Sequence, residues 1–344
     1  TLNSTHEKAF KYNVGIDATL FKGLNLTVDG YYQRRKDIWV SSAGKYTDVL
    51  GMDAPFENAG IVDSWGVEVG ADYTKRLGDF AFNVGGNFAF HRNEIKEQLE
   101  EPRLYDNLKQ TGHRLNQIYG MQAVGLFKNQ AEINGSLPQE FGTLKPGDIK
   151  YKDINRDGII DEQDIVPIGY PTTPEIIYGF GFSVGYKAFD FNCFFQGSAR
   201  SSFFISPLRI TPFAQPYDPD NELGGKQANN ALLQVIADNH WSESNQNMYA
   251  FWPRLSDTAI SNNNQSSTWW LRDGTFLRMK SAEIGYTLPK RLTSKAKLEN
   301  LRIYVSGTNL FNISKFKIWD TEMGNNGLGY PVQRVFNVGI QLSL

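Results

Sequence analysis

The sequence lacks the features that mark several common classes of protein. Of its 344 residues only Cys193 is a cysteine, which excludes a disulfide scaffold and a cysteine-rich zinc site. No charge of one sign dominates, since the chain has 35 Lys and Arg and 37 Asp and Glu. This disfavours a nucleic-acid binder, because there is no basic excess to neutralise phosphates. No run approaches the roughly 18 apolar residues that a membrane-spanning helix needs. Intrinsic disorder is excluded by an aromatic content of 13%.

The average polarity of the chain is compatible with two architectures. Its mean hydropathy is negative, as in soluble globular proteins. A transmembrane β-barrel gives a similar average, because its strands alternate apolar outward and polar inward residues. The 32 glycines, 23 phenylalanines, 16 tyrosines and 7 tryptophans make the barrel the alternative to test.

Alternation of apolar and polar residues recurs along the whole chain. In the last ten residues, VFNVGIQLSL, apolar side chains occupy every second position up to Leu344. About nine such stretches of roughly 10 residues occur, which suits a tilted membrane-spanning strand better than a soluble strand of about 5–6 residues. They lie at 12–20, 24–28, 67–74, 80–91, 180–187, 190–199, 276–288, 300–309 and 334–344.

Short and long connections alternate between these predicted strands. In an up-and-down barrel this places all long loops at one end and all tight turns at the other, as in outer-membrane barrels. The long connections are 36–60, 93–175, 200–275 and 310–333. We therefore predict an all-β, transmembrane, antiparallel up-and-down barrel with long extracellular loops at 93–175 and 200–275.

The ends of the chain indicate that it is part of a longer protein. Residues 1–10 are polar and contain no signal peptide, so the protein is either cytosolic or this chain starts inside a longer one. An odd number of strands and a start inside a loop favour the second interpretation. We therefore expect residues 1–344 to form a piece of a larger barrel.

A calcium-type loop lies in the longest connection. Residues 153–164 read DINRDGIIDEQD, which has the spacing of an EF-hand loop, with Gly158 at the sixth position. Asp164 stands where an EF-hand has Glu, and the flanking prolines and glycines do not predict two helices. The sequence thus predicts a stand-alone structural Ca²⁺ site, with an Asp/Asn/Gly-rich turn as the alternative. The predicted ligands are Asp153, Asn155, Asp157, Ile159 (through its carbonyl), Asp161 and Asp164.

Other motifs give weaker indications of chemistry. Residues 181–185 match the G-x-S-x-G motif of serine hydrolases, but the alternation runs straight through Ser183, which predicts a strand residue. The four histidines show no metal-binding spacing, and we predict that the protein is not an enzyme. Trp241 and Trp252, in an aromatic loop at 240–276, are candidates for stacking on a sugar ring. The alternative for these aromatics is packing of the loop, or an interfacial girdle in the case of Trp269 and Trp270.

Several stretches give the chain a family resemblance. It resembles the C-terminal part of the SusC/RagA-like TonB-dependent outer-membrane transporters of Bacteroidetes, in the order of the family and over nearly the whole chain. The matching stretches are NAGIVDSWGVEV at 58–69, PGDIKYKDINRDGIIDEQD at 146–164, WLRDGTFLRMKSAEIGYTLP at 270–289, LRIYVSGTNLFNISKFKIWDTE at 301–322 and YPVQRVFNVGIQLSL at 330–344.

The resemblance implies a barrel of about twenty-two strands, plugged by an N-terminal domain that this chain lacks. It implies active import of an oligosaccharide or peptide under a SusD-like lipoprotein lid, driven through TonB, without chemistry on the ligand. The family often pairs two transporters with two lids. Outer-membrane lipid and lipopolysaccharide are the expected surroundings. The polar face, including Asn83, Asn87, Gly185, Asn337 and Gln341, would line the conduit.

Two other functions remain open from the sequence. A TonB-dependent siderophore or cobalamin receptor would have the same barrel without a lid. A secreted all-β carbohydrate-binding protein with structural calcium would wash off membranes without detergent.

Overall fold

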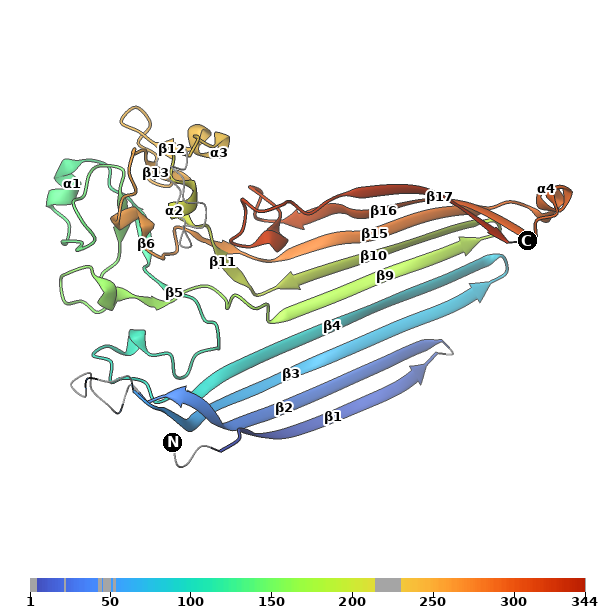
Figure 1. Ribbon diagram of the computed structural model, residues 1–344, viewed down its shortest axis with the longest axis horizontal. Helices are drawn as coiled ribbons and strands as arrows, with labels where there is room; N and C mark the ends of the chain where they lie inside the picture. The colour runs from blue at the N-terminus through green and yellow to red at the C-terminus, as the bar shows by residue number, and fades with distance from the viewer. Residues whose placement is uncertain are drawn as a thin grey trace.

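The main sheet of the protein is antiparallel and has nine strands. The computed structural model describes residues 5–343, except 22, 43–44, 46–50, 52–53 and 214–229. In this part the strands lie in the order β1-β2-β3-β4-β9-β10-β15-β16-β17, so that neighbours in the sheet follow one another along the chain (Figure 1). They span Lys8–Leu20 (β1), Leu24–Ser41 (β2), Phe56–Leu77 (β3), Phe80–Glu97 (β4), Ile176–Tyr186 (β9), Phe189–Ala199 (β10), Phe276–Thr287 (β15), Asn300–Ser314 (β16) and Val335–Ser343 (β17).

The other elements of the described chain are short. The strands among them are β5 (Tyr119–Gly120), β6 (Ala123–Leu126), β7 (Ile149–Tyr151), β8 (Val166–Pro167), β11 (Ser202–Phe204), β12 (His240–Trp241), β13 (Trp252–Arg254) and β14 (Leu271–Asp273). The helices are α1 (Gln130–Asn134), α2 (Pro207–Ile210), α3 (Gln234–Asp238) and α4 (Lys290–Thr293). The 3₁₀ turns are Asp106–Leu108, Glu162–Asp164, Asn262–Asn264, Ser294–Ala296 and Thr321–Met323.

All nine predicted strands are present, and several are longer than predicted. β2, β3 and β4 contain 18, 22 and 18 residues. Charged residues break the apolar alternation in the added parts, as at Arg34–Lys36, but their backbones continue the ladder with β1. The apolar pattern therefore marks only the middle of each long strand.

The two faces of the sheet have opposite chemistry, which the strand pairing shows row by row. Directly paired residues point to the same face, and the next residue points to the other. From β4 to β17 one row of paired residues is entirely apolar: Phe82, Val184, Phe191, Ile284, Val305 and Val338. The adjacent row is entirely polar: Asn83, Ser183, Asn192, Glu283, Ser306 and Asn337. We call these the apolar face and the polar face.

Large side chains of the apolar face are exposed. Val14 is 75%, Ile284 54% and Val338 78% exposed. A soluble protein rarely leaves so long an apolar surface in water. The arrangement fits the wall of a transmembrane β-barrel, whose outward face contacts lipid.

None of the helices in the described residues is long and apolar enough to cross a membrane.

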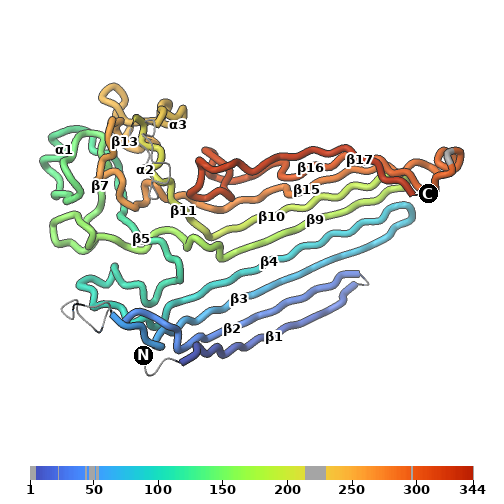
Figure 2. The backbone as a smooth tube through the Cα atoms, in the orientation of Figure 1, coloured from blue at the N-terminus to red at the C-terminus, as the bar shows by residue number. Residues whose placement is uncertain are grey.

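The connections separate the sheet into two different ends, as the alternation of loop lengths predicts. At one end the chain turns between β3 and β4, between β9 and β10 and, through α4, between β15 and β16 (Figures 1 and 2). At the other end the connections from β4 to β9 and from β10 to β15 gather into one body. We call this body, formed by the described residues of 98–175 and 200–275, the loop assembly.

Candidate functional site

The loop assembly has a hydrophobic core of its own. Side chains from both long connections contribute, and all members of this cluster are at most 9% exposed. Phe316, from the connection between β16 and β17, joins it and packs edge-on against Phe203. The buried members are Met121, Leu126, Ile149, Tyr151, Ile160, Phe203, Ile205, Ile210, Ile236, Trp241, Ala250, Trp252, Trp270 and Phe316. Two segments separated by two strands of the sheet thus fold as a single unit.

The two tryptophans predicted to contact a ligand lie in this core. Trp241 and Trp252 are 5% and 4% exposed. The Trp252 ring lies 4.9 Å from that of Trp270, which is 1% exposed. Ligand stacking by Trp241 or Trp252 stays a prediction, and their burial favours the packing alternative. The position of Trp270 likewise favours packing over an interfacial girdle.

A buried carboxylate joins the two connections at the centre of the assembly. Asp148 is fully buried and accepts a hydrogen bond of 2.7 Å from Nε of Arg254. It also accepts a hydrogen bond of 2.9 Å from the Asn263 side-chain amide and one of 2.8 Å from the backbone N–H of Lys145. The contacts with Arg254 and Asn263 link residues more than 100 positions apart in the sequence. They satisfy a charge that could not otherwise be buried at low cost.

Buried amides extend this network. The Asn263 Oδ1 accepts the backbone N–H of Ile149 at 2.9 Å. The Gln139 side chain accepts the N–H of Tyr151 at 2.7 Å and donates to Asn262 at 2.7 Å. Sequence reasoning did not identify this network. The only signal was that Asp148 belongs to the PGDIKYKD stretch on which the family resemblance partly rests.

The predicted calcium loop lies between β7 and β8 at the surface of the assembly. Asp153 accepts the backbone N–H of Arg156 at 2.6 Å and that of Gly158 at 3.1 Å. Gly158 has φ +87°, a left-handed conformation that glycine adopts without strain. The sharp turn predicted at the sixth position is present.

Asp164 closes the loop from inside. It is fully buried, and its Oδ1 accepts the N–H of Ile154 at 2.7 Å and that of Asn155 at 3.2 Å. Asp161 caps the following 3₁₀ turn together with Asp164. Residues at both ends of the loop are thus held together by hydrogen bonds.

In the described residues no group of three or more His, Cys, Asp or Glu side chains is arranged to hold a metal ion. The donor set nevertheless consists of hard oxygens, which suit Ca²⁺. The calcium site stays a prediction based on the spacing and the turn.

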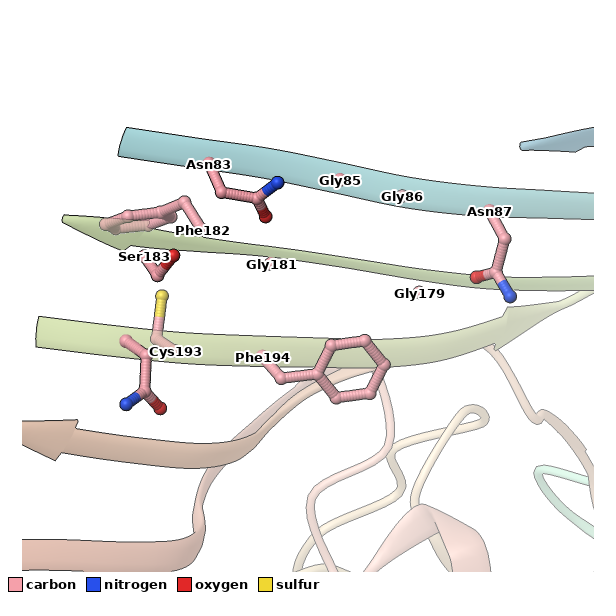
Figure 3. A pocket seen from close by; sticks show the side chains of 11 residues that line it. Asn83, Gly85, Gly86, Asn87, Gly179, Gly181, Phe182, Ser183, Cys193 and Phe194 are labelled. Atoms are coloured by element: carbon pink, nitrogen blue, oxygen red, sulfur yellow. The ribbon is translucent and has the colours of Figure 1, made fainter. Parts of the chain in front are cut away.

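The polar face is hollowed between β4, β9 and β10. Figure 3 shows Asn83 and Asn87 on β4 and the ring of Phe194 on β10, with glycines between them. The hollow has a volume of about 410 Å³ and no charged residue lines it. A Cβ atom on Gly179 would lie 2.9 Å from Cζ of Phe194, so glycine allows this ring to approach β9.

The residues predicted to line a conduit occupy the polar face. Asn83 pairs with Ser183, Asn337 with Ser306, and Gln341 with Arg302. Ser183 lies in the middle of β9 with no turn beside it, which confirms that it is a strand residue. Cys193, on the apolar face, is 4% exposed.

The fold defines the class of protein first: nine strands of the wall of an up-and-down transmembrane β-barrel. Comparison with known proteins then confirms the more particular resemblance predicted from the sequence. The chain is 25% identical to TonB-dependent receptor P3 of Formosa agariphila, over 99% of this chain and 34% of that protein. It is 24% identical to TonB-dependent receptor SusC of Bacteroides thetaiotaomicron, over 99% of this chain and 32% of that protein.

Solved structures show the same architecture. The RagAB peptide transporter superimposes with a TM-score of 0.71 at 21% identity, over 98% of this chain and 35% of that chain. No protein-family model matches the chain. The chain therefore spans about a third of the length of the relatives that it resembles.

Proposed function

We propose that this chain forms part of the wall of a SusC/RagA-type importer in the outer membrane. One observation carries the proposal: a long antiparallel sheet has one exposed apolar face, one polar face, and its long loops at one end only. The apolar face would contact lipid, the polar face would line the conduit, and the loop assembly would lie outside the cell. The similarity to TonB-dependent receptors supports this assignment.

The proposed cargo is an oligomeric nutrient, a peptide or an oligosaccharide, imported without chemistry on it. A solved relative is a peptide transporter by name. A SusD-like lipoprotein would close over the loop assembly, and TonB would act through a part of the protein outside this chain. The uncharged hollow on the polar face suits neutral polar cargo.

Purification of the complete protein with an affinity tag tests this proposal. We expect the protein to stay in the membrane fraction until detergent is added and to bring a surface lipoprotein with it. We also expect cells that lack the protein to lose growth on one class of oligomer. A barrel that purifies without a lipoprotein and supports uptake of a metal chelate would instead indicate a siderophore or cobalamin receptor. A protein that washes off without detergent would contradict the membrane assignment.

We further propose that residues 153–164 bind one structural Ca²⁺. Isolated extracellular calcium modules bind with dissociation constants of about 10⁻⁴–10⁻³ M. At a hundredfold excess over such a constant, binding stabilises the folded loop by about 2.7 kcal/mol. We therefore expect Ca²⁺ to slow proteolysis of the loop assembly and EGTA to reverse this protection.

Calorimetric titration of Ca²⁺ into the wild type and two variants measures the site. Asp153→Asn with Asp157→Asn should abolish binding. Asp106→Asn, which removes an exposed carboxylate outside the loop, should leave it unchanged. Equal binding by all three proteins, or no binding by the wild type at 10 mM Ca²⁺ (about ten times the weaker constant), contradicts the site.

A further inference from the structure

Two arginines lie over an aromatic ring of the apolar face, at the end of the sheet where that face stops. Phe90 pairs with Val67 and Ile176, two residues of the apolar face. The guanidinium carbon of Arg92 lies 5.5 Å from the Phe90 ring centroid, and that of Arg200 lies 5.9 Å from it. Both arginines therefore lie on the apolar face, at the end of the sheet that carries the loop assembly.

A buried carboxylate fixes these arginines together with a third. Glu175 is 4% exposed and accepts two hydrogen bonds from Arg92, of 2.8 and 2.9 Å. Arg114 contacts the same carboxylate at 2.6 Å and Arg200 at 3.6 Å. Burial opposes ionisation of Glu175, but these arginines lower the pKa of its carboxyl, so it is charged at neutral pH. The cluster is pre-organised by a group that water hardly reaches.

The cluster retains excess positive charge that is accessible from outside. Three guanidinium groups share one carboxylate, which leaves an excess of two positive charges. The Arg92, Arg114 and Arg200 side chains are 28%, 25% and 41% exposed. On β2 to β4, Arg34 pairs with Asp63 and Lys96 pairs with Glu94, so these two carboxylates have cationic partners of their own.

We infer that Arg92, Arg114 and Arg200 form a binding site for the phosphorylated headgroup of an outer-leaflet lipid. Guanidinium groups bind phosphate through paired, charge-assisted hydrogen bonds. The acyl chains of the same lipid would lie along the exposed apolar face, past Phe88 and Val84. The arginines therefore lie where the phosphate of such a lipid would be, and the apolar face lies where its acyl chains would be. This inference rests on the proposed position of the apolar face in the membrane.

Lipid binding to the complete protein in phosphatidylcholine nanodiscs tests the site. The probe is lipid A with both phosphates, compared with lipid A from which they have been removed, and bound lipid is counted by native mass spectrometry. The test variant combines Arg114→Gln and Arg200→Gln and leaves Arg92 to pair with Glu175. The control is Lys187→Gln, which removes a cation lying 5.2 Å above the Tyr186 ring at the opposite end of the sheet.

We expect the wild type and the control to hold the phosphorylated lipid at least about tenfold more tightly than the dephosphorylated one. The double variant should lose this preference while folding as the wild type does, which is checked by comparing the gel mobility of the two proteins before and after heating. If the double variant does not fold, Arg200→Gln alone should weaken the preference, since Arg200 makes the longest contact to Glu175.

Three results would overturn the inference. They are an unchanged preference in the variant, no preference in the wild type, or displacement of the lipid by inorganic phosphate at millimolar concentration, which would indicate a site for soluble anions. Each of these can occur while the protein remains in the membrane fraction, so none of them contradicts the proposed function. Release of the protein from membranes without detergent would contradict that function instead.

Discussion

Replacing Asp148 with alanine should lower the free energy of unfolding of the loop assembly by about 3–5 kcal/mol, since removing one partner of a buried ion pair leaves the other charge unpaired. Arg254, with 18% of its side chain exposed, would lose its carboxylate, and Asn263 would lose an acceptor. Hydrogen exchange at Ile149 and Tyr151 reports this directly, because their amides bond to the same network. We expect their exchange to accelerate by a factor of at least about one hundred.

A rescue variant separates the charge from the packing. Asp148→Leu combined with Arg254→Met replaces both partners with apolar side chains, which is often close to neutral. It should recover most of the protection that Asp148→Ala loses. Asp106→Ala, whose carboxylate pairs with Lys109 at the surface, should leave the exchange of these amides unchanged. Equal effects of the two alanine variants would show that the Asp148 pair does not hold the connections together.

Replacing Trp270 with alanine should destabilise the loop assembly by about 3–5 kcal/mol, as expected for a large aromatic side chain removed from a core. Trp270 is 1% exposed, packs against Trp252, and donates a 2.7 Å hydrogen bond to the Asn263 carbonyl. Its loss therefore leaves a cavity and an unpaired acceptor. Brief trypsin digestion measures the effect at Lys150, because this residue lies in β7 between the buried Ile149 and Tyr151 and cleavage there requires the strand to open.

A matched variant tests whether burial is the cause. Trp39 is 45% exposed and stacks on Phe56 near the end of β2. Trp39→Ala should leave the rate of cleavage close to that of the wild type. If Trp270→Ala resists trypsin as well as Trp39→Ala does, the core of the loop assembly does not depend on this side chain.

The sheet could be predicted from the sequence because the pattern that defines each strand lies within that strand. Alternation at a period of two places each side chain on a face without knowledge of its partner strand, as in the row from Phe82 to Val338. The alternation of loop lengths then predicts which connections share an end. Strand ends were harder, because charged residues such as Arg34 and Arg35 continue β2 without an apolar pattern.

The loop assembly could not be predicted in this way. Its contacts join positions that are far apart, such as Asp148 and Arg254, and no periodicity relates them. Burial of Trp241 and Trp252 follows from this long-range packing, whereas a pattern of aromatic residues in a loop is equally typical of a binding surface. The turn at Gly158 was predictable because its φ and hydrogen bonds depend on a few adjacent residues.

The strict division of the sheet into two faces limits how the chain can change in length. Loss of one residue within β16 would turn Ser306 toward the apolar face and Val305 toward the polar face, along with every side chain beyond the break. Relative to β10, β15 has one extra residue, Lys280, which is accommodated by a bulge because the adjacent Phe194 and Phe195 pair with Ser281 and Met279. Insertions should therefore accumulate in homologues almost entirely within the loop assembly and the connection at 315–334. Strand lengths should vary only where a bulge can restore the alternation.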